Sequence, residues 1–270
     1  MTRVERAILI LIDGLRPDAL LQGHTLHIDA LIERGACSLQ AQTVMPSITL
    51  PTHTSLFYSA PPEKHGVVTN TYQPFPQPMT GLLELAHQHK LLTGAIYSWE
   101  PLRDLWRPNH VDIGYFINLY SSATRDFDYE VARAAADLIP AERLELSFVY
   151  LGMVDEIAHR VQWMTPEYFE AVERADAAVG LLVERLKTEN LLDSTVILIQ
   201  ADHGGHEHRH GEDIPEDMTI PWLLSGPGVK AGCRLTEPVS ILDTAPTLAH
   251  LLGLTIPPDW QGQVIREALL

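Results

Sequence analysis

The chain has 270 residues, of which 46% are hydrophobic, and its formal net charge is -16. This is enough apolar sequence for one large α/β core. The excess of carboxylates argues against nucleic acid or an anionic membrane as a partner, because polyanions are held by Lys and Arg. Two cysteines, Cys37 and Cys233, provide neither a disulfide framework nor thiolate metal-binding spacing, so we expect a reducing, cytoplasmic compartment.

The first predicted element is a strand at the amino terminus. Its apolar run, residues 7–12, stops at Asp13-Gly14 after six residues, which is too short for an export signal or a membrane span. Farther along, helical periodicity occurs around residues 26–34, 80–90, 128–139 and 166–188. The last of these helices has a good N-cap and first-turn pair in Thr165 and Pro166.

Alternation of buried strands with amphipathic helices predicts a mostly parallel central sheet with helices on both faces. We expect residues 1–270 to form one domain. Residues 70–125 fit the alternation less well, because they are rich in proline and aromatic residues around a predicted strand at residues 93–98. We interpret this segment as a small cap or lobe on the substrate side, although ordinary packing explains each aromatic side chain equally well.

Three apolar runs end in an aspartate, namely residues 7–13, 147–155 and 195–202. Runs of this kind are typical of strands buried on both faces, and such sheets bind ligands at the carboxyl ends of their strands. Asp13, Asp155 and Asp202 should therefore meet there. Histidines accompany two of them, at His159 and in the cluster His203, His206, His208 and His210. Carboxylates and imidazoles at one sheet edge predict a metal site with ligands for two ions.

Thr49 is the candidate nucleophile. Pro51 suits the first turn of a helix, which places Thr49 at or just before the helix N-terminus, where the dipole favours an anion. A hydroxyl in this position can attack phosphorus when a divalent cation activates it. The alternative role for Thr49 is simple N-capping of the helix.

The residues around Thr49 carry a family resemblance. The pattern Thr49-x-Pro51-x-His53, followed by Pro62-Glu63-x-His65-Gly66-x-x-x-Asn70, resembles the nucleophile region of type I phosphodiesterases and nucleotide pyrophosphatases of the alkaline phosphatase superfamily. The other signatures of the superfamily follow in order: Asp13-Gly14, Asp155-x-x-x-His159, Asp202-His203-Gly204, and a helix from Asp243 leading to Leu252-Gly253. The resemblance covers nearly the whole chain and implies an alkaline phosphatase-like fold.

The resemblance also implies a ligand set for two divalent cations. Asp13, Asp202, His203 and Thr49 would hold one cation, and Asp155, His159 and His210 the other. His206 and His208 compete with His210 for the last position. Mixed Asp and His ligands suit zinc best, with manganese second. Thr49 would attack in line and form a phosphothreonine intermediate.

The substrate implied by the resemblance is a small-molecule phosphate ester, and a diester is favoured because no arginine stands beside Thr49 in the sequence. Nucleotide pyrophosphatases have an aromatic residue where this chain has Leu50, so Trp99 or Trp106 would have to supply a stacking face. At Thr52 we expect one hydrogen bond to a phosphate oxygen, in place of an asparagine in the family. The sequence does not fix an oligomeric state.

Several alternatives remain within the superfamily: a phosphomonoesterase, a phosphonate hydrolase or a phosphomutase. A sulfatase is excluded, because sulfatases need a Cys or Ser at position 49. Outside the superfamily, the His206–His210 cluster would suit a metal-binding protein without turnover. The hydroxyl at Thr49 argues against this role, since metal storage needs no nucleophile.

Overall fold

A central sheet organises the molecule. The structure is a computed structural model that describes residues 4–118 and 126–270, and within these residues eight strands form one sheet in the order β4-β3-β5-β1-β6-β7-β2-β8. The strands are β1 (Arg6–Ile12), β2 (Gly35–Gln42), β3 (Thr93–Tyr97), β4 (Ile113–Phe116), β5 (Leu146–Leu151), β6 (Thr195–Gln200), β7 (Thr219–Ser225) and β8 (Cys233–Arg234). Only β7 runs antiparallel to its neighbours, so the prediction of a mostly parallel sheet is confirmed.

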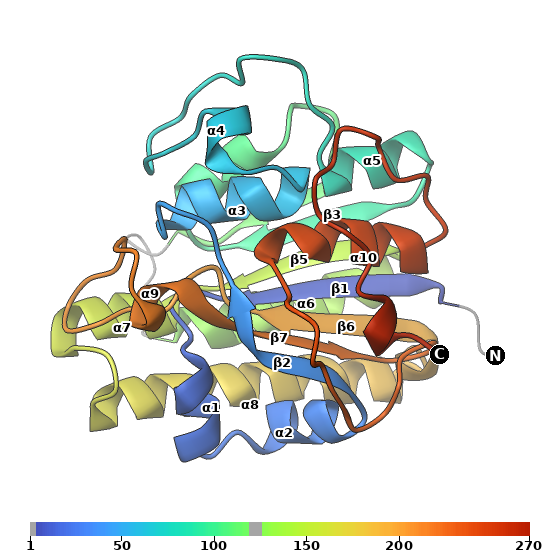
Figure 1. The fold of residues 1–270 in the computed structure, drawn as a ribbon. Helices are drawn as coiled ribbons and strands as arrows, with labels where there is room; N and C mark the ends of the chain where they lie inside the picture. Colours follow the sequence, from blue (N-terminus) through green and yellow to red (C-terminus); the bar gives the residue numbers. More distant parts are fainter. Residues whose placement is uncertain (1–3, 119–125) are drawn as a thin grey trace.

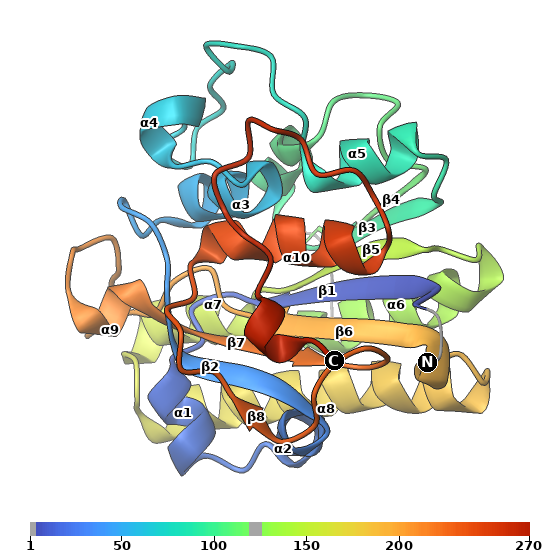
Figure 2. The same ribbon diagram turned by 45° about the vertical axis from the view of Figure 1, so that its right-hand side comes forward.

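Helices cover both faces of the sheet, as the sequence predicts (Figures 1 and 2). One layer contains α3 (Thr49–Tyr58), α5 (Leu82–Gln88) and α10 (Thr244–Leu251), with α4 (Pro62–His65) outside it. The other layer contains α2 (Leu26–Glu33), α6 (Phe127–Ala141), α7 (Met153–Val161) and α8 (Pro166–Thr188), and the short helices α1 (Pro17–Gln22) and α9 (Pro215–Met218) lie near the carboxyl edge. The predicted helix at residues 166–188 has these bounds in the structure, and Thr165 caps it by accepting a hydrogen bond from the Tyr168 amide.

The three central strands position the candidate site. Every residue of β1, β5 and β6 is buried, which explains why these strands are continuous aliphatic runs. β1 pairs in parallel with β5 on one side and with β6 on the other, so the three strands end at the same edge of the sheet. The loops that follow them carry the aspartates.

The sequence prediction is wrong in one detail, because Asp155 does not end a strand. β5 stops at Leu151, and Asp155 lies in the first turn of α7. The buried Asp128 carboxylate accepts a hydrogen bond from the Met153 amide and thereby satisfies a free N–H at the start of this helix. The helical spacing then places Asp155 and His159 on one face, four residues apart.

The segment predicted as a lobe is partly built into the sheet, since β3 and β4 are two of its strands. Trp106, Tyr72 and Phe75 line a cavity of about 580 Å³ together with Tyr58, at the opposite end of α3 from Thr49, whereas Trp99 is half-buried. Residues 119–125 of this segment lie outside the described residues, and its substrate-side role stays a prediction. Among the described residues, none of the helices combines the length and the apolar character needed to cross a bilayer.

Candidate active site

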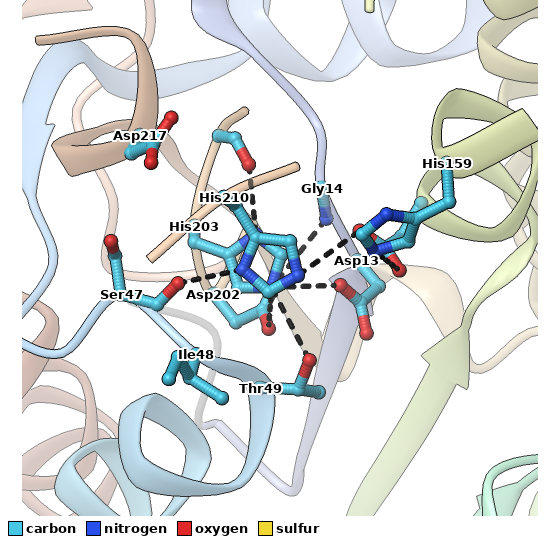
Figure 3. Close-up of polar contacts among 12 residues, drawn as sticks. Asp13, Gly14, Ser47, Ile48, Thr49, His159, Asp202, His203, His210 and Asp217 are labelled. Carbon is cyan, nitrogen blue, oxygen red and sulfur yellow. Dashed lines mark hydrogen bonds and ion pairs between the residues drawn. The ribbon is translucent and has the colours of Figure 1, made fainter. Parts of the chain in front are cut away.

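The first cluster joins side chains from three parts of the chain (Figure 3). His203 lies at its centre: its Nε2 atom is 3.3 Å from Asp13 Oδ1, 3.2 Å from Asp202 Oδ2 and 3.3 Å from Thr49 Oγ1. All four side chains are at most 5% exposed. Donor atoms that surround a tetrahedral zinc ion at about 2.0–2.1 Å lie about 3.3–3.4 Å from one another, so the observed separations suit one cation.

The second cluster is built around Asp155. Its Oδ2 atom lies 3.3 Å from His159 Nε2, and its Oδ1 atom lies 3.8 Å from His210 Nε2. The imidazole rings of His203 and His210 stack with centroids 3.6 Å apart, which makes the two clusters contiguous. The chain therefore presents two neighbouring sets of donors: three carboxylate or imidazole side chains with the Thr49 hydroxyl in the first, and three carboxylate or imidazole side chains in the second.

The carboxylates of both clusters include oxygen atoms that lack a hydrogen-bond partner among the described residues. Asp13 Oδ1, Asp155 Oδ1 and Asp202 Oδ2 are buried and have no hydrogen-bond partner among the described residues. Burial, followed by repulsion from neighbouring carboxylates, raises the pKa of both Asp13 and Asp202. Buried carboxylate oxygens without partners are costly, and a bound cation would remove this cost. These residues therefore fit a divalent metal.

The histidine rings are turned so that Nε2 faces the carboxylates. Their Nδ1 atoms lie within hydrogen-bond distance of backbone carbonyl oxygens: 2.8 Å from Gly204 for His203, 2.7 Å from His208 for His159, and 2.8 Å from Ser47 for His210. A carbonyl oxygen can only accept, so Nδ1 carries the proton and donates. Such outer contacts orient metal-binding imidazoles.

The pKa values of the three histidines are shifted in different directions. Burial lowers the pKa of His203 to about 3 and that of His210 to about 4, so both rings are neutral at pH 7. A hydrogen bond to Asp155 raises the pKa of His159 to about 9. Without a cation, a proton thus occupies the side of His159 that faces Asp155, and binding of a metal there would release it.

The competing histidines lie differently from His210. His206 Nδ1 is 2.7 Å from Asp217 Oδ1, and its Nε2 accepts a hydrogen bond from the Arg209 side chain. His208 is exposed, and its Nδ1 donates to the His159 carbonyl oxygen. Of the three alternatives for the last ligand, the geometry favours His210.

Thr49 is the first residue of α3, and Ile48 is the N-cap. The Thr49 hydroxyl does not cap the helix; it faces His203. His53, one turn farther on, is fully buried and its Nδ1 donates to the Thr49 carbonyl oxygen at 2.7 Å. The hydroxyl is thus held at the positive end of a helix dipole, beside the first cluster.

Thr52 is oriented differently from the sequence-based expectation, and Asn70, to which the sequence assigned no role, lies beside the start of α3. Thr52 is fully buried, and its hydroxyl donates to the carbonyl oxygens of Ile48 and Thr49, so the structure does not turn it toward the clusters. Its contact with substrate stays a prediction without support from this geometry. Asn70 is exposed and accepts a hydrogen bond from the Leu50 amide, next to Thr49, through Oδ1; its NH₂ group has no partner among the described residues and can donate. Its place at the end of the Thr49 motif was the signal for this role.

Two further residues that sequence reasoning missed support the clusters. The Tyr150 hydroxyl donates a hydrogen bond to Asp13 Oδ2, and Tyr150 is a polar-tipped residue within the apolar strand β5. The Trp163 indole donates to the Gly14 carbonyl oxygen at 2.9 Å and packs edge-on against His159. No sequence signal pointed to Trp163, because it follows α7 in a turn.

Comparison with known proteins identifies the family of this chain. The sequence profile of the type I phosphodiesterase / nucleotide pyrophosphatase family matches residues 7–102 and 84–217. An uncharacterised pyrophosphatase/phosphodiesterase of Schizosaccharomyces pombe is 26% identical over 222 residues, which cover 73% of this chain and 44% of that protein. Mouse arylsulfatase K is 29% identical over 107 residues, which cover 38% of this chain and 19% of the sulfatase. The chain thus spans less than half the length of these relatives.

A solved structure shares the fold. Murine ectonucleotide pyrophosphatase / phosphodiesterase 5, an inactive form in complex with AMP, superimposes with a TM-score of 0.84 at 16% identity, covering 98% of this chain and 100% of that one. At this identity the likeness concerns the fold, which it assigns as alkaline phosphatase-like. Because the family profile spans most of the sequence, the chain belongs to the type I phosphodiesterase / nucleotide pyrophosphatase family.

Proposed function

We propose that this protein is a phosphoric ester hydrolase that uses two divalent cations and Thr49 as its nucleophile. One observation carries the proposal: three buried carboxylate oxygens without hydrogen-bond partners converge with imidazole Nε2 atoms beside the Thr49 hydroxyl. Asp13, Asp202, His203 and Thr49 would hold one cation, and Asp155, His159 and His210 the other. Zinc suits this donor set best and manganese is second.

The residues of the chain divide the chemistry among them. When bound, the cations lower the pKa of the attacking hydroxyl and neutralise charge on the phosphoryl group. Thr49 Oγ1 loses its proton and forms a bond to phosphorus, while the bond to the leaving oxygen breaks and that oxygen takes up a proton, which gives a phosphothreonine. Water then attacks phosphorus, the bond to Thr49 Oγ1 breaks, and one proton of the water returns to that oxygen. The free Asn70 NH₂ group would donate to a phosphoryl oxygen during both steps.

Charge balance explains how an acidic protein attracts an anionic substrate. Two divalent cations bring four positive charges, and Asp13, Asp155 and Asp202 offset three of them. The remaining positive charge is local and lies at the N-terminus of α3, whose dipole has the same sign. The substrate is therefore drawn to the site although the whole chain carries -16.

We favour a phosphodiester over a phosphomonoester as substrate. The hydrogen bonds of Thr49 in the described residues are with His203, His53, Thr52 and its own helix, and none of them involves an arginine. A dianionic monoester would gain most from a guanidinium there. The S. pombe relative is named a pyrophosphatase/phosphodiesterase, which supports the same preference.

We also propose that the protein is located in the cytoplasm, since both cysteines are free.

The deciding experiment compares Thr49→Ala with Thr49→Ser in the metal-loaded protein. Thr49→Ala should still bind cations, because the carboxylates and imidazoles remain, but should lose hydrolysis of aryl phosphate esters. Thr49→Ser keeps a hydroxyl and should retain part of the rate. Substrates are an aryl monoester, an aryl diester, a nucleotide aryl ester and a phosphonate. Unchanged turnover by Thr49→Ala would rule out Thr49 as the nucleophile. If the monoester or the phosphonate is hydrolysed fastest, the proposed preference for a diester is wrong.

A further inference from the structure

We propose that Asp217, acting through His206, is a positioning residue for the second cation site. It would hold residues 206–212, here called the histidine loop, so that His159 and His210 keep the orientation that cation binding requires. This inference rests on the proposed function, because it concerns the same cations. In Figure 3 Asp217 lies at the upper left, away from the donor atoms themselves.

Asp217 ties together the two ends of the histidine loop. Its side chain is fully buried. Oδ1 accepts a hydrogen bond from His206 Nδ1 at 2.7 Å, and Oδ2 accepts one from the Glu212 amide at 2.9 Å. Its carbonyl oxygen accepts a third from the amide of Gly204, the residue directly after His203, at 2.8 Å. One carboxylate therefore fixes where the loop begins and where it ends.

The interior of the loop is a tight turn built on His206. The backbone amides and carbonyls of His206 and Arg209 exchange two hydrogen bonds of 2.9 Å, and Glu207 between them has a left-handed φ of 47°. His206 Nε2 accepts a hydrogen bond from the Arg209 side chain. Because Nδ1 donates to Asp217 and Nε2 accepts from Arg209, both ring nitrogens of His206 have partners and neither is available to a cation.

The histidine loop in turn orients His159 on α7. His159 Nδ1 donates to the His208 carbonyl oxygen at 2.7 Å, and His208 Nδ1 donates to the His159 carbonyl oxygen at 3.1 Å. The Trp163 amide adds a hydrogen bond to the Glu207 carbonyl oxygen at 2.9 Å. If the loop moved, His159 would lose the acceptor that sets its ring orientation, and His210 would move with the backbone that carries it.

The first cation site should depend much less on the histidine loop. Asp13 is held by Tyr150, and Asp202 by the Gly14 amide and by a hydrogen bond from Thr43 to its carbonyl oxygen. His203 donates to the adjacent Gly204 carbonyl oxygen. None of these hydrogen bonds involves residues 206–212, and the first site touches the loop through the stacking of His203 on His210. Loss of Asp217 function should therefore weaken one cation site and spare the other.

The test is a calorimetric titration of the chelated protein with Zn²⁺, with the melting temperature of the metal-free protein as a check on folding. In Asp217→Asn one of the two accepting oxygens becomes an NH₂ group, so the side chain can no longer accept from both His206 and Glu212 through separate oxygens. His206→Ala removes the donor to Asp217. Both variants should bind the first Zn²⁺ as the wild type does and the second 10–100-fold more weakly, the usual effect of losing an outer partner of a metal ligand.

Two matched variants serve as controls. His206→Asn keeps an N–H donor near the position of Nδ1 and should restore part of the affinity for the second Zn²⁺. Asp213→Asn removes the same charge from an exposed position directly after the loop and should change neither affinity.

The outcomes separate the inference from the proposed function. If the wild type binds two Zn²⁺ ions and both variants bind them equally well, the role of Asp217 is refuted and the hydrolase proposal stands. Equal weakening of both sites together with a lower melting temperature also refutes it, since the residue would then act on the fold alone. A wild type that binds fewer than two ions overturns both proposals.

Discussion

The carboxylate of Asp128 should make the stability of this protein depend on pH. Asp128 is 1% exposed and accepts hydrogen bonds from the Met153 amide at the start of α7, the helix that carries Asp155 and His159. Burial raises the pKa of Asp128 from 3.8 to about 7, although these backbone hydrogen bonds oppose the rise. In the unfolded chain the carboxyl group returns to its ordinary pKa.

The sign and the size of the effect follow from this difference. A carboxyl group whose pKa is higher in the folded protein stabilises the fold below the unfolded pKa, and this contribution is lost as the pH rises through the folded pKa. Each pKa unit corresponds to about 1.4 kcal/mol, so the ionisation of Asp128 lowers the free energy of unfolding at pH 8 by about 4 kcal/mol relative to pH 4. The window of the loss is about pH 4 to pH 7.

The Asp128→Asn variant removes the titration but keeps an oxygen that can accept from the Met153 amide. We expect the variant to be more stable than the wild type at pH 8 by up to about 4 kcal/mol, or roughly 10 °C in melting temperature, and the advantage to shrink steadily toward pH 4. Thermal unfolding of the chelated proteins, followed by circular dichroism from pH 4 to pH 8, measures this difference.

Asp137→Asn is the matched control, because Asp137 lies on the same helix, α6, but is exposed and forms only a surface ion pair with Arg185. The Asp137→Asn substitution should change the free energy of unfolding by less than about 1 kcal/mol at every pH. A difference between Asp128→Asn and the wild type that does not change with pH would refute the argument, since it would mean that burial does not perturb this carboxyl group.

Three further predictions concern the candidate site. Tyr150→Phe removes the hydrogen bond to Asp13 and should weaken binding of the first cation about 10-fold in a Zn²⁺ titration; an unchanged affinity would show that Tyr150 only packs. Gly204→Ala would place Cβ 2.0 Å from the Glu216 carbonyl oxygen and should lower the free energy of unfolding by about 1–3 kcal/mol in urea; full stability would contradict the close approach. A chelator should abolish hydrolysis, and added Zn²⁺ or Mn²⁺ should restore it; activity indifferent to the chelator would remove the metal from the proposal.

The sequence was most informative where local patterns have one physical meaning. Residues 166–188 form a helix with a capping threonine, a proline in its first turn and a buried apolar face, and each of these features can be read from the sequence alone. The aliphatic strands β1, β5 and β6 could be predicted because a strand buried on both faces has no polar positions. Their shared direction then required their carboxyl ends to meet.

Sequence patterns were least informative where the outcome depends on contacts between distant segments. The run that ends in Asp155 is apolar up to that residue, and the change from strand to helix after Gly152 is supported by Asp128, which lies 25 residues before Met153. Thr52 follows the nucleophile at a plausible spacing, but its hydroxyl turns back to its own helix. Asn70, 20 residues from Leu50 in the chain, reaches the same helix end instead.

The amino-acid sequence by itself determined the order of strands and helices, the family, and the set of acidic and imidazole side chains available at one sheet edge, because periodicity and motif spacing are local properties. The tertiary structure alone decided which histidine faces Asp155. His206, His208 and His210 alternate along one short loop and are equivalent by spacing. Asp217 accepts a hydrogen bond from His206, whereas the Ser47 carbonyl oxygen, 163 residues away in the sequence, accepts one from His210, since each ring N–H must find an acceptor.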